Sequence, residues 1–357
     1  MKQLFFPLVA GLLLSCLSAT AQDVKVKPEV KVKPEVKVKT SVNVNADADE
    51  TEDSREKAKQ EKQEAKEQER AEKNRLREIE RDKREKEKYP EQFKEHISKQ
   101  YSLQKTAGSV LAIYNLDGFI KVEGYAGDKI LIEVDKTIFG KDKEILEQGK
   151  KEVKVEFEQI GDSVVAYLVY PWDMRPQDWR DERDQWSNRR RIEYKCKLEF
   201  TVKVPFNSHV RVSTINDGEI KIKDVAGKLN VSNINRGIEI VNAKGTTHAT
   251  TINGDLTVNY LGNPPGASTF HTLNGTLTAT FPANLSADLQ FKSMNGSFYT
   301  DFADFEMLPA RVTKTQEKKA DGVVYKLNKS NDVRIGSGGK TYKFETLNGN
   351  IYIKKQS

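Results

Sequence analysis

Residues 252–258 read Ile-Asn-Gly-Asp-Leu-Thr-Val, and close copies of this stretch recur along the second half of the chain. In each copy an apolar residue precedes an Asn–Gly pair, sometimes with a residue inserted, and a short alternating strand follows. The corner residues are Asn216 and Gly218, Asn235 and Gly237, Asn253 and Gly254, Asn274 and Gly275, Asn295 and Gly296, and Asn348 and Gly349. From Gly218 to Gly296 the glycines lie 19, 17, 21 and 21 residues apart, which leaves room for two short strands per unit.

Asparagine and glycine tolerate positive φ, so each pair predicts a tight corner. Because the spacing is similar, we expect each unit to be one coil of a β-solenoid. The residues before the corners would then stack as an internal ladder made of Ile215, Ile234, Ile252, Leu273 and Met294. A meander or sandwich with Asn–Gly at hairpin tips is the alternative. We interpret the asparagines as structural corners and not as a row of ligands.

Strand-like alternation continues from the repeat back to Ser109, and residues 101–357 are predicted to form one β-repeat domain. The further strand candidates are 109–122, 129–138, 154–170 and 191–205. The charged stretch 141–152 could be a helix or a loop. Tyr194, Cys196 and Leu198 alternate with charged residues, so we expect Cys196 to be a buried, inert thiol.

The first residues are typical of a secretory signal. Lys2 precedes a mostly apolar run, and Ser18-Ala19-Thr20-Ala21 offers a cleavage site, so residues 1–21 are predicted to be removed on export. A lipoprotein box ending at Cys16 is the rival interpretation, but the bulky Leu14 fits it less well, and lipid anchoring at Cys16 is not expected. The compartment would be the periplasm or the cell surface of a Gram-negative bacterium. The mature chain would keep one cysteine, which excludes an intramolecular disulfide.

Two low-complexity segments follow the signal. Residues 22–50 repeat Val-Lys-Val-Lys-Pro-Glu, and we expect a disordered, extended tether rather than an added edge strand, because proline resists a regular sheet. Its lysines could contact an anionic membrane surface. Residues 51–100 are predicted to be a charged helical spacer, since pairs such as Glu80 and Arg84 recur four residues apart. It has too few apolar residues for a coiled coil, and a short amphipathic turn at 93–101 would dock it on the β-domain.

The repeat motif, with Val202-Lys203-Val204-Pro205 leading into Val210-Arg211-Val212, resembles the bacterial putative-adhesin family of β-strand-repeat proteins (auto-transporter adhesin head-like domains). The resemblance covers residues 105–357. It implies a β-solenoid, an envelope or surface location and an adhesive or scaffolding role, and it supplies no catalytic residues. The charged N-terminal segment and an insert at 170–191 depart from the family pattern.

The insert 170–191 is the best ligand-binding candidate, because it holds every tryptophan of the chain. Tryptophan rings could stack on sugars or lie at a lipid interface, and arginines could bind phosphate or carboxylate. The candidates are Trp172, Trp179, Trp186, Arg175, Arg180 and Arg183. The competing interpretation is an amphipathic segment that covers an end or edge of the sheet.

Catalysis has little support in the sequence. The histidines are scattered and no metal-ligand spacing or phosphate-binding glycine loop occurs, so we expect neither a metal nor a cofactor. The carboxylates of the repeat do not share a position, which disfavours a polysaccharide lyase or hydrolase. Nucleic acid is not an expected partner of an exported chain.

The sequence therefore predicts an all-β protein: a β-solenoid-like repeat domain preceded by a disordered tether and a long charged single α-helix. We expect a non-catalytic exported adhesin or scaffold that binds an envelope polymer, a glycan or a protein. The alternatives are a carbohydrate-active enzyme on a β-helix and a periplasmic envelope-stress or signalling accessory.

Overall fold

The computed structural model describes residues 87–169, 192–319 and 322–356, together with residues 72–73, 76, 79–80 and 83–85. Side chains are described outside 310–330. The chain divides into two compact units, Met1–Ala71 and Glu72–Ser357, and the second holds all of these residues. The predicted signal, the tether and the insert 170–191 lie outside the described residues, so their assignments stay predictions.

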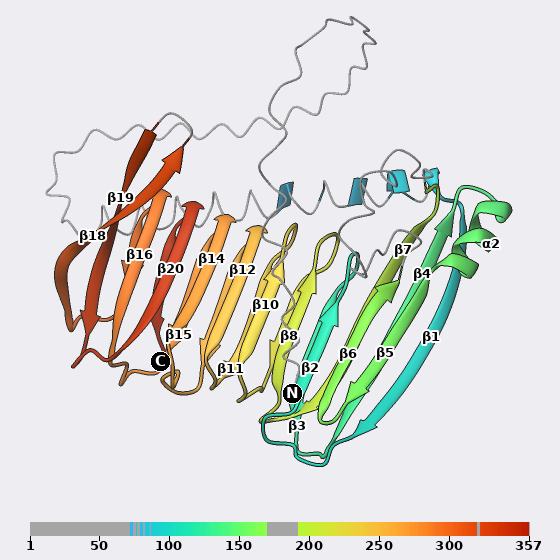
Figure 1. Ribbon diagram of the computed structural model, residues 1–357, viewed down its shortest axis with the longest axis horizontal. Coiled ribbons are helices and arrows are strands. Elements are labelled where there is room, and N and C mark those ends of the chain that lie inside the picture. Colours follow the sequence, from blue (N-terminus) through green and yellow to red (C-terminus); the bar gives the residue numbers. More distant parts are fainter. Residues whose placement is uncertain are drawn as a thin grey trace, which may run out of the picture. The chain divides into compact units, whose positions relative to one another are not determined.

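The described chain is mostly β and forms two large mixed sheets (Figure 1). The ten-stranded sheet has the order β1 (Glu91–Ser102), β4 (Lys129–Gly140), β7 (Lys195–Pro205), β3 (Ile120–Tyr125), β9 (Ile220–Lys223), β11 (Ile238–Ala243), β13 (Leu256–Tyr260), β15 (Leu277–Phe281), β21 (Ile351–Lys355) and β17 (Phe298–Thr300). The eleven-stranded sheet has the order β18 (Phe305–Lys319), β19 (Gly322–Ile335), β16 (Ala287–Asn295), β20 (Lys340–Asn348), β14 (Ser268–Asn274), β12 (Thr247–Asn253), β10 (Leu229–Asn233), β8 (His209–Thr214), β2 (Val110–Tyr114), β6 (Ser163–Val169) and β5 (Lys154–Ile160).

The predicted solenoid is wrong as a description of this architecture. From β8 to β17 the chain alternates between the sheets, and strands two apart pair in parallel up to β15. A solenoid would add each coil at the end of the stack. Here β20 and β21 instead lie between earlier strands, with β20 between β14 and β16 and β21 between β15 and β17. Antiparallel pairs such as β1–β4 and β18–β19 extend both ends, so the sheets are mixed.

Alternating residues of each strand fill the space between the sheets. In β8 and β10, Val210, Val212, Leu229 and Val231 are buried while the residues between them are not. Strands with this period present one face to the core. Toward the C-terminal turns the core becomes aromatic, and its stacked pairs include Tyr260–Phe281 at 5.2 Å and Phe281–Tyr342 at 5.6 Å between ring centroids.

The residues predicted to form the internal ladder are not the ones that the core buries. Ile215, Ile234, Ile252 and Leu273 are only half-buried, and Met294 is 75% exposed. The residue just before each of the first four, such as Thr214 or Thr251, is the buried one, whereas Ser293 before Met294 is only half-buried. Successive side chains of a strand point to opposite faces, so a shift of one position moves a whole ladder to the other side.

The predicted helical spacer does not reach residue 100. Described residues between Glu72 and Lys88 are helical, but Glu91–Ser102 form β1, which pairs with β4 along its full length. The amphipathic turn expected at 93–101 is therefore a strand, whose Phe93, Ile97 and Tyr101 pack on the core. The sequence did not reveal this strand, because charged and polar residues dominate the segment and hide any apolar–polar alternation.

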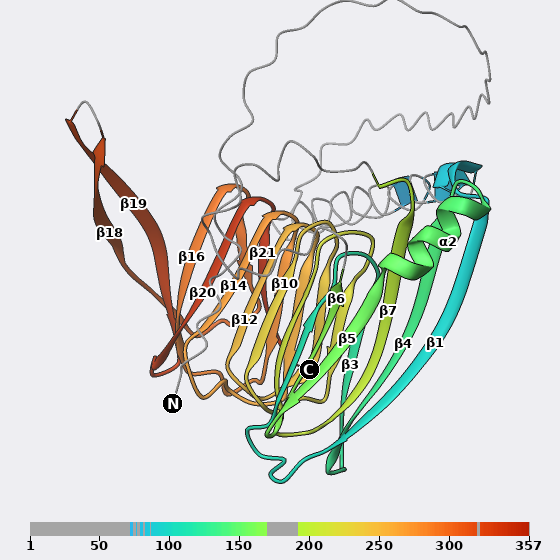
Figure 2. The same cartoon turned by 45° about the vertical axis from the view of Figure 1, so that its right-hand side comes forward.

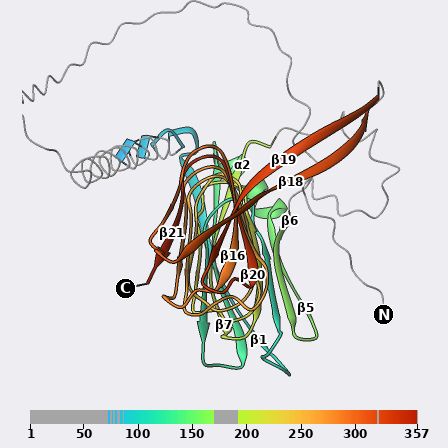
Figure 3. The ribbon, with the colours of Figure 1, turned by 90° about the vertical axis from the view of Figure 1, so that its left-hand side faces the viewer.

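The open choice at residues 141–152 is settled as a helix, α2 (Lys143–Glu152). Asp142 caps its N-terminus by accepting a hydrogen bond from the Ile145 amide at 2.9 Å. Leu146 and Gly149 face the sheet, where a side chain on Gly149 would meet Ile138 and Tyr194. At the other end, Figures 2 and 3 show the β18–β19 hairpin projecting away from the sheet stack.

Candidate binding face

The predicted ligand site in the insert cannot be placed. Trp172, Trp179 and Trp186 with their neighbouring arginines lie outside the described residues, so that site stays a prediction. The corner asparagines and glycines, in contrast, all lie in the described part of the chain. They stack from turn to turn at one edge of the two sheets.

The corner asparagines form a hydrogen-bonded ladder on the solvent side. From Asn235 onward, each side-chain amide donates a hydrogen bond to the side-chain oxygen of the asparagine in the adjacent turn. Asn348 comes between Asn274 and Asn295 in this ladder, because β20 lies between β14 and β16. The donor–acceptor distances are 3.2 Å for Asn235 to Asn216, 3.2 Å for Asn253 to Asn235, 2.9 Å for Asn274 to Asn253, 2.7 Å for Asn348 to Asn274 and 2.8 Å for Asn295 to Asn348. Each amide still has a donor and acceptor capacity beyond the ladder.

A second, buried polar ladder lies behind the corners. Thr251 and Thr272 donate hydroxyl hydrogen bonds to the carbonyls of Arg236 and Gly254, at 2.8 and 2.9 Å. Asn233 donates to the carbonyls of Gly218 and Gly237, at 2.9 and 3.1 Å. These side chains satisfy corner carbonyls, of which that of Gly237 also accepts from the Ile220 amide. A buried carbonyl left without any partner costs about 1–3 kcal/mol.

Glycine is required at the corners by close packing between turns, which corrects the predicted reason. A Cβ on Gly275 would lie 2.1 Å from the Gly254 carbonyl oxygen, and one on Gly349 would lie 1.9 Å from that of Gly275. Neither residue has a positive φ; at the first corner Asp217, which lies between Asn216 and Gly218, does, at 34°. The corners therefore fix the distance between neighbouring turns.

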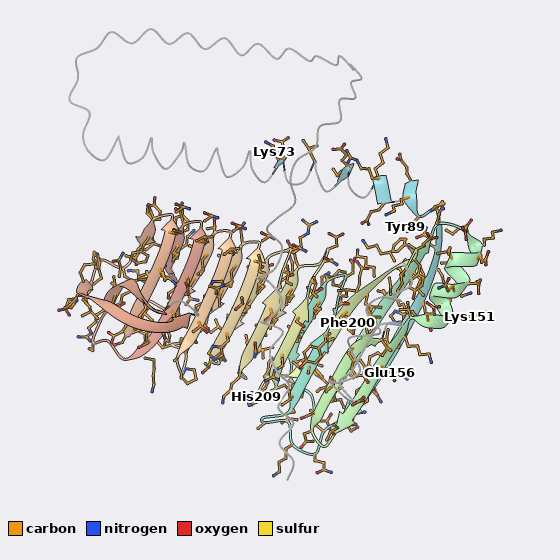
Figure 4. All side chains as sticks on the ribbon, turned by 45° about the horizontal axis from the view of Figure 1, so that its top comes forward. Lys73, Tyr89, Lys151, Glu156, Phe200 and His209 are labelled. Atoms are coloured by element: carbon orange, nitrogen blue, oxygen red, sulfur yellow. The ribbon has the colours of Figure 1, made fainter. Side chains whose placement is uncertain are left out.

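Parallel pairing aligns one outward row across the ten-stranded sheet. The row runs through Lys121, Lys221, Glu239, Thr257, Thr278, Tyr352 and Tyr299. Adjacent strands in a sheet lie about 4.8 Å apart, so the row presents side chains at a regular repeat. In Figure 4 the labelled Phe200 marks β7, the neighbour of β3 at the end of this sheet that carries Lys121.

The first part of the row is charged. The Lys221 ammonium lies 3.0 Å from Glu239 and 3.3 Å from Glu219. Hydrogen bonding to Glu239 and the charge of Glu219 raise the pKa of Lys221. These side chains are about half exposed and neutralise one another, which is typical of a solvated surface. We call Lys121, Lys221 and Glu239 the charged stretch.

The second part of the row carries no charge. Thr257, Thr278, Tyr352 and Tyr299 follow one another on β13, β15, β21 and β17, and we call them the uncharged stretch. The rings of Tyr299 and Tyr352 stack with centroids 5.0 Å apart and planes 12° from parallel. Tyr299 is 42% exposed. The Lys354 ammonium lies 6.0 Å from the Tyr352 centroid.

Amide and hydroxyl groups border the uncharged stretch on both sides. Asn350, next to the asparagine ladder, donates to the Tyr352 hydroxyl at 3.3 Å and accepts from the Ser297 amide at 2.9 Å. On the other side Asn259 and Thr280 are paired in register. The surface thus combines a rigid aromatic pair with hydrogen-bonding groups that can donate and accept.

An ionic network closes the ladder at its first corners. Lys195 lies 2.8 Å from Glu85 of the helical segment, 3.1 Å from Asp117 and 3.5 Å from Asp217. Burial raises the pKa of Asp117, although the charge of Lys195 acts against this shift. Burial disfavours the Lys195 charge, but hydrogen bonds to Glu85 and Asp117 outweigh it and raise the Lys195 pKa. This network holds the helical segment on the corners.

Two observations on the described residues concern metal binding and thiol chemistry. None of their His, Cys, Asp and Glu side chains gather in a group of three or more that could hold a metal ion. Cys196 is buried, as predicted, and burial raises its pKa to about 12, so it is not a nucleophile at neutral pH. No helix in the described part of the chain is both long and apolar enough to cross a membrane.

Comparison with known proteins gives faint likenesses only. No family model and no curated protein matches the chain. Among solved structures, a putative cell adhesion protein from Clostridium sporogenes has a TM-score of 0.36 at 9% identity and covers 74% of this chain and 100% of its own. A putative adhesin from Bacteroides fragilis has a TM-score of 0.30 at 11% identity, covering 73% and 97%. A putative lipid binding protein from Parabacteroides distasonis has a TM-score of 0.21 at 9% identity, with the same coverage. At such low TM-scores these likenesses support no inference about function.

The sequence contained a signal for the uncharged stretch. After each Asn–Gly corner the middle residue of the apolar-x-apolar triplet faces outward, and this position reads Thr257, Thr278, Tyr299 and Tyr352 in the later units. Reading the repeat by column, rather than seeking a cluster in one segment, would have found the row. The stacking of Tyr299 on Tyr352 could not be found, because it depends on the out-of-order insertion of β21.

Proposed function

We propose that this protein is a non-catalytic exported envelope protein that binds a glycan polymer along the uncharged stretch. The observation that carries the proposal is the aligned row of Thr257, Thr278, Tyr352 and Tyr299 beside the asparagine ladder. Sugar rings pack their C–H faces on aromatic rings, while their hydroxyls need donors and acceptors of the amide and hydroxyl kind.

The rigidity of the row supports a polymer rather than a small molecule. The glycine corners and the buried threonine ladder hold adjacent turns at a fixed separation. A repeating surface is matched by a repeating ligand, which can gain affinity from several weak contacts at once. Tyrosine provides a large contact area at a low cost in side-chain entropy.

The experiment is a binding screen of the full-length chain on an array of neutral and anionic glycans. We expect binding to neutral glycans, with about tenfold weaker affinity for Tyr299→Ala and for Tyr352→Ala, because a buried aromatic contact contributes on the order of 1–2 kcal/mol. Tyr114→Ala is the matched control. This residue is 38% exposed on β2 of the other sheet, and its loss should change nothing.

The same samples discriminate the alternatives. Release of reducing ends from a bound polysaccharide would favour the carbohydrate-active enzyme. Binding that survives both tyrosine substitutions but is lost in Trp172→Ala, Trp179→Ala and Trp186→Ala would assign the ligand to the insert. Absence of all glycan binding, together with one stoichiometric co-purifying protein, would favour the envelope accessory.

A further inference from the structure

Four of the corners contain a chemically reactive dipeptide. The chain has four Asn–Gly peptides, at residues 253–254, 274–275, 295–296 and 348–349. Asparagine is a thermolabile residue. Its side-chain carbonyl carbon can be attacked by the backbone nitrogen of the next residue, and glycine leaves that nitrogen open to approach because it has no Cβ. Since the same two residues occur at all four sites, a difference in their reactivity reports on the fold.

At three of these corners the adjacent turn holds the glycine nitrogen. Each of the three glycine amides donates a hydrogen bond to the backbone carbonyl of the next asparagine in the ladder. The donor–acceptor distances are 3.1 Å for Gly254 to Asn274, 3.1 Å for Gly275 to Asn348 and 3.2 Å for Gly349 to Asn295. An amide nitrogen in such a bond must give the bond up before it can lose its proton and attack. The stacking of the turns therefore protects these three sites.

Gly296 belongs to the last corner of the ladder, and no further corner follows it. Among the described residues, none accepts a hydrogen bond from the Gly296 amide. None of them donates to the side-chain oxygen of Asn295 either, although the corresponding oxygens of the two preceding turns each accept a bond. Residues 294–297 are all exposed, whereas Gly275 is buried. The last corner thus has the same reactive groups without the protection.

We propose that Asn295 is a site of spontaneous deamidation and that the stacked turns protect the other three Asn–Gly peptides. The Gly296 nitrogen gives its proton to hydroxide and bonds to the side-chain carbonyl carbon of Asn295. The bond from that carbon to the side-chain nitrogen breaks, and this nitrogen takes up a proton from water and leaves as ammonia. Water then opens the cyclic imide at either carbonyl, which yields aspartate or isoaspartate. Of the reacting groups, only the Asn295 amide is hydrogen bonded, to Asn348 at the exposed surface.

Deamidation at this corner changes the strand that follows it. Isoaspartate adds one carbon to the main chain between residues 295 and 296, just before β17. Phe298 of β17 pairs with Ile351 of β21 and stacks on Phe291, with ring centroids 3.7 Å apart. A longer corner shifts β17 out of this register. Backbone amides of β17 in the aged chain should therefore exchange with solvent faster than those of the fresh chain.

The test is peptide mass spectrometry of the full-length chain after incubation in a mildly alkaline buffer, with digestion at acidic pH to avoid new conversion. The fraction of acid at each Asn–Gly peptide gives four rates from one sample. We expect Asn295 to convert at least about tenfold faster than the other three sites, which is the ratio that a net hydrogen bond of about 1.4 kcal/mol gives. In concentrated urea the four rates should become similar. Similar rates in the folded chain, or a ratio that persists in urea, would overturn the proposal.

Asn348→Ala separates the two kinds of protection. This variant removes the side-chain ladder bonds to Asn274 and Asn295, but residue 348 keeps the carbonyl that accepts from the Gly275 amide. We expect faster conversion of Asn295 and an unchanged, slow rate at Asn274. Asn216→Ala, which removes a ladder oxygen at the opposite end, is the matched control and should leave all four rates as in the parent chain. Rapid conversion of Asn274 in an Asn348→Ala chain that circular dichroism shows to be folded would refute protection by the glycine amide bond.

Discussion

The charged stretch and the uncharged stretch have one backbone design and two surfaces. Both belong to the same outward row, in parallel strands that follow stacked corners. Lys221 and Glu239 neutralise each other in the first, whereas Thr278, Tyr352 and Tyr299 place hydroxyl and aromatic groups in the row of the second. The comparison teaches that corners and core set the spacing of the row, while the outward position after each corner sets its chemistry.

The largest effect on stability should come from disrupting the stacked corners, which position both stretches. Gly275→Val places a side chain against the Gly254 carbonyl, so neighbouring turns must separate, and we expect a loss of about 3 kcal/mol or more in the free energy of unfolding. Gly262→Val is the control, because a Cβ there meets nothing within 4 Å. Urea unfolding followed by alkylation of Cys196 measures both. Equal stabilities of the two variants would show that the corners are loosely packed.

The next effect concerns the difference between the stretches directly. Thr278→Lys brings a charge into the uncharged stretch, and we expect about tenfold weaker glycan binding. The glycan would have to displace the long lysine side chain and restrict its rotamers, and both cost free energy. Stability should change little, since the position faces outward and is only half-buried. Binding isotherms on the glycan found by the array measure the effect. Unchanged affinity would show that the glycan does not contact β15.

A smaller effect separates the two sides of one turn. Thr272 donates from the core side to the Gly254 carbonyl, so Thr272→Val should lower the free energy of unfolding by about 1–2 kcal/mol. Thr278→Val, on the outward side, should stay within about 0.5 kcal/mol of the parent. Chemical denaturation of the pair gives the difference. If the outward substitution costs more, the buried ladder is not what holds the corners.

The smallest effect is expected in the charged stretch. Lys221→Ala removes ion pairs that are about half exposed, so the free energy of unfolding should change by less than about 0.5 kcal/mol. Glycan affinity should stay as in the parent chain. Denaturation and binding isotherms on one sample check both statements. A marked loss of affinity would extend the binding face across both stretches.

Local patterns predicted much of the core but not its arrangement. Alternation located the strands around Leu256, Leu277 and Cys196, because burial on one face of a strand has a period of two residues. It placed the ladder one residue away, on Ile215 instead of Thr214, because a polar threonine was not expected inside. Threonine is tolerated there because its hydroxyl bonds a corner carbonyl, a contact between turns that one strand does not reveal.

The order of the strands in the two sheets could not be predicted from the sequence, for a different reason. β21 inserts between β15 and β17, although β16 to β20 separate it from β15 in the chain. Parallel edges are alike in pattern, so spacing alone cannot choose among them. The candidate site depends on this choice, because Tyr352 meets Tyr299 only through the insertion. For the same reason the uniform stacking predicted from the glycine spacing was wrong.

The most direct measurement is an NMR titration of the tyrosine ring signals in the full-length chain, with the glycan that the array identifies. The account predicts saturable shifts for Tyr299 and Tyr352, with Tyr114 on the other sheet and the buried Tyr260 unchanged. Shifts confined to Tyr114, or to Tyr170 at the edge of the tryptophan-rich insert, would contradict it.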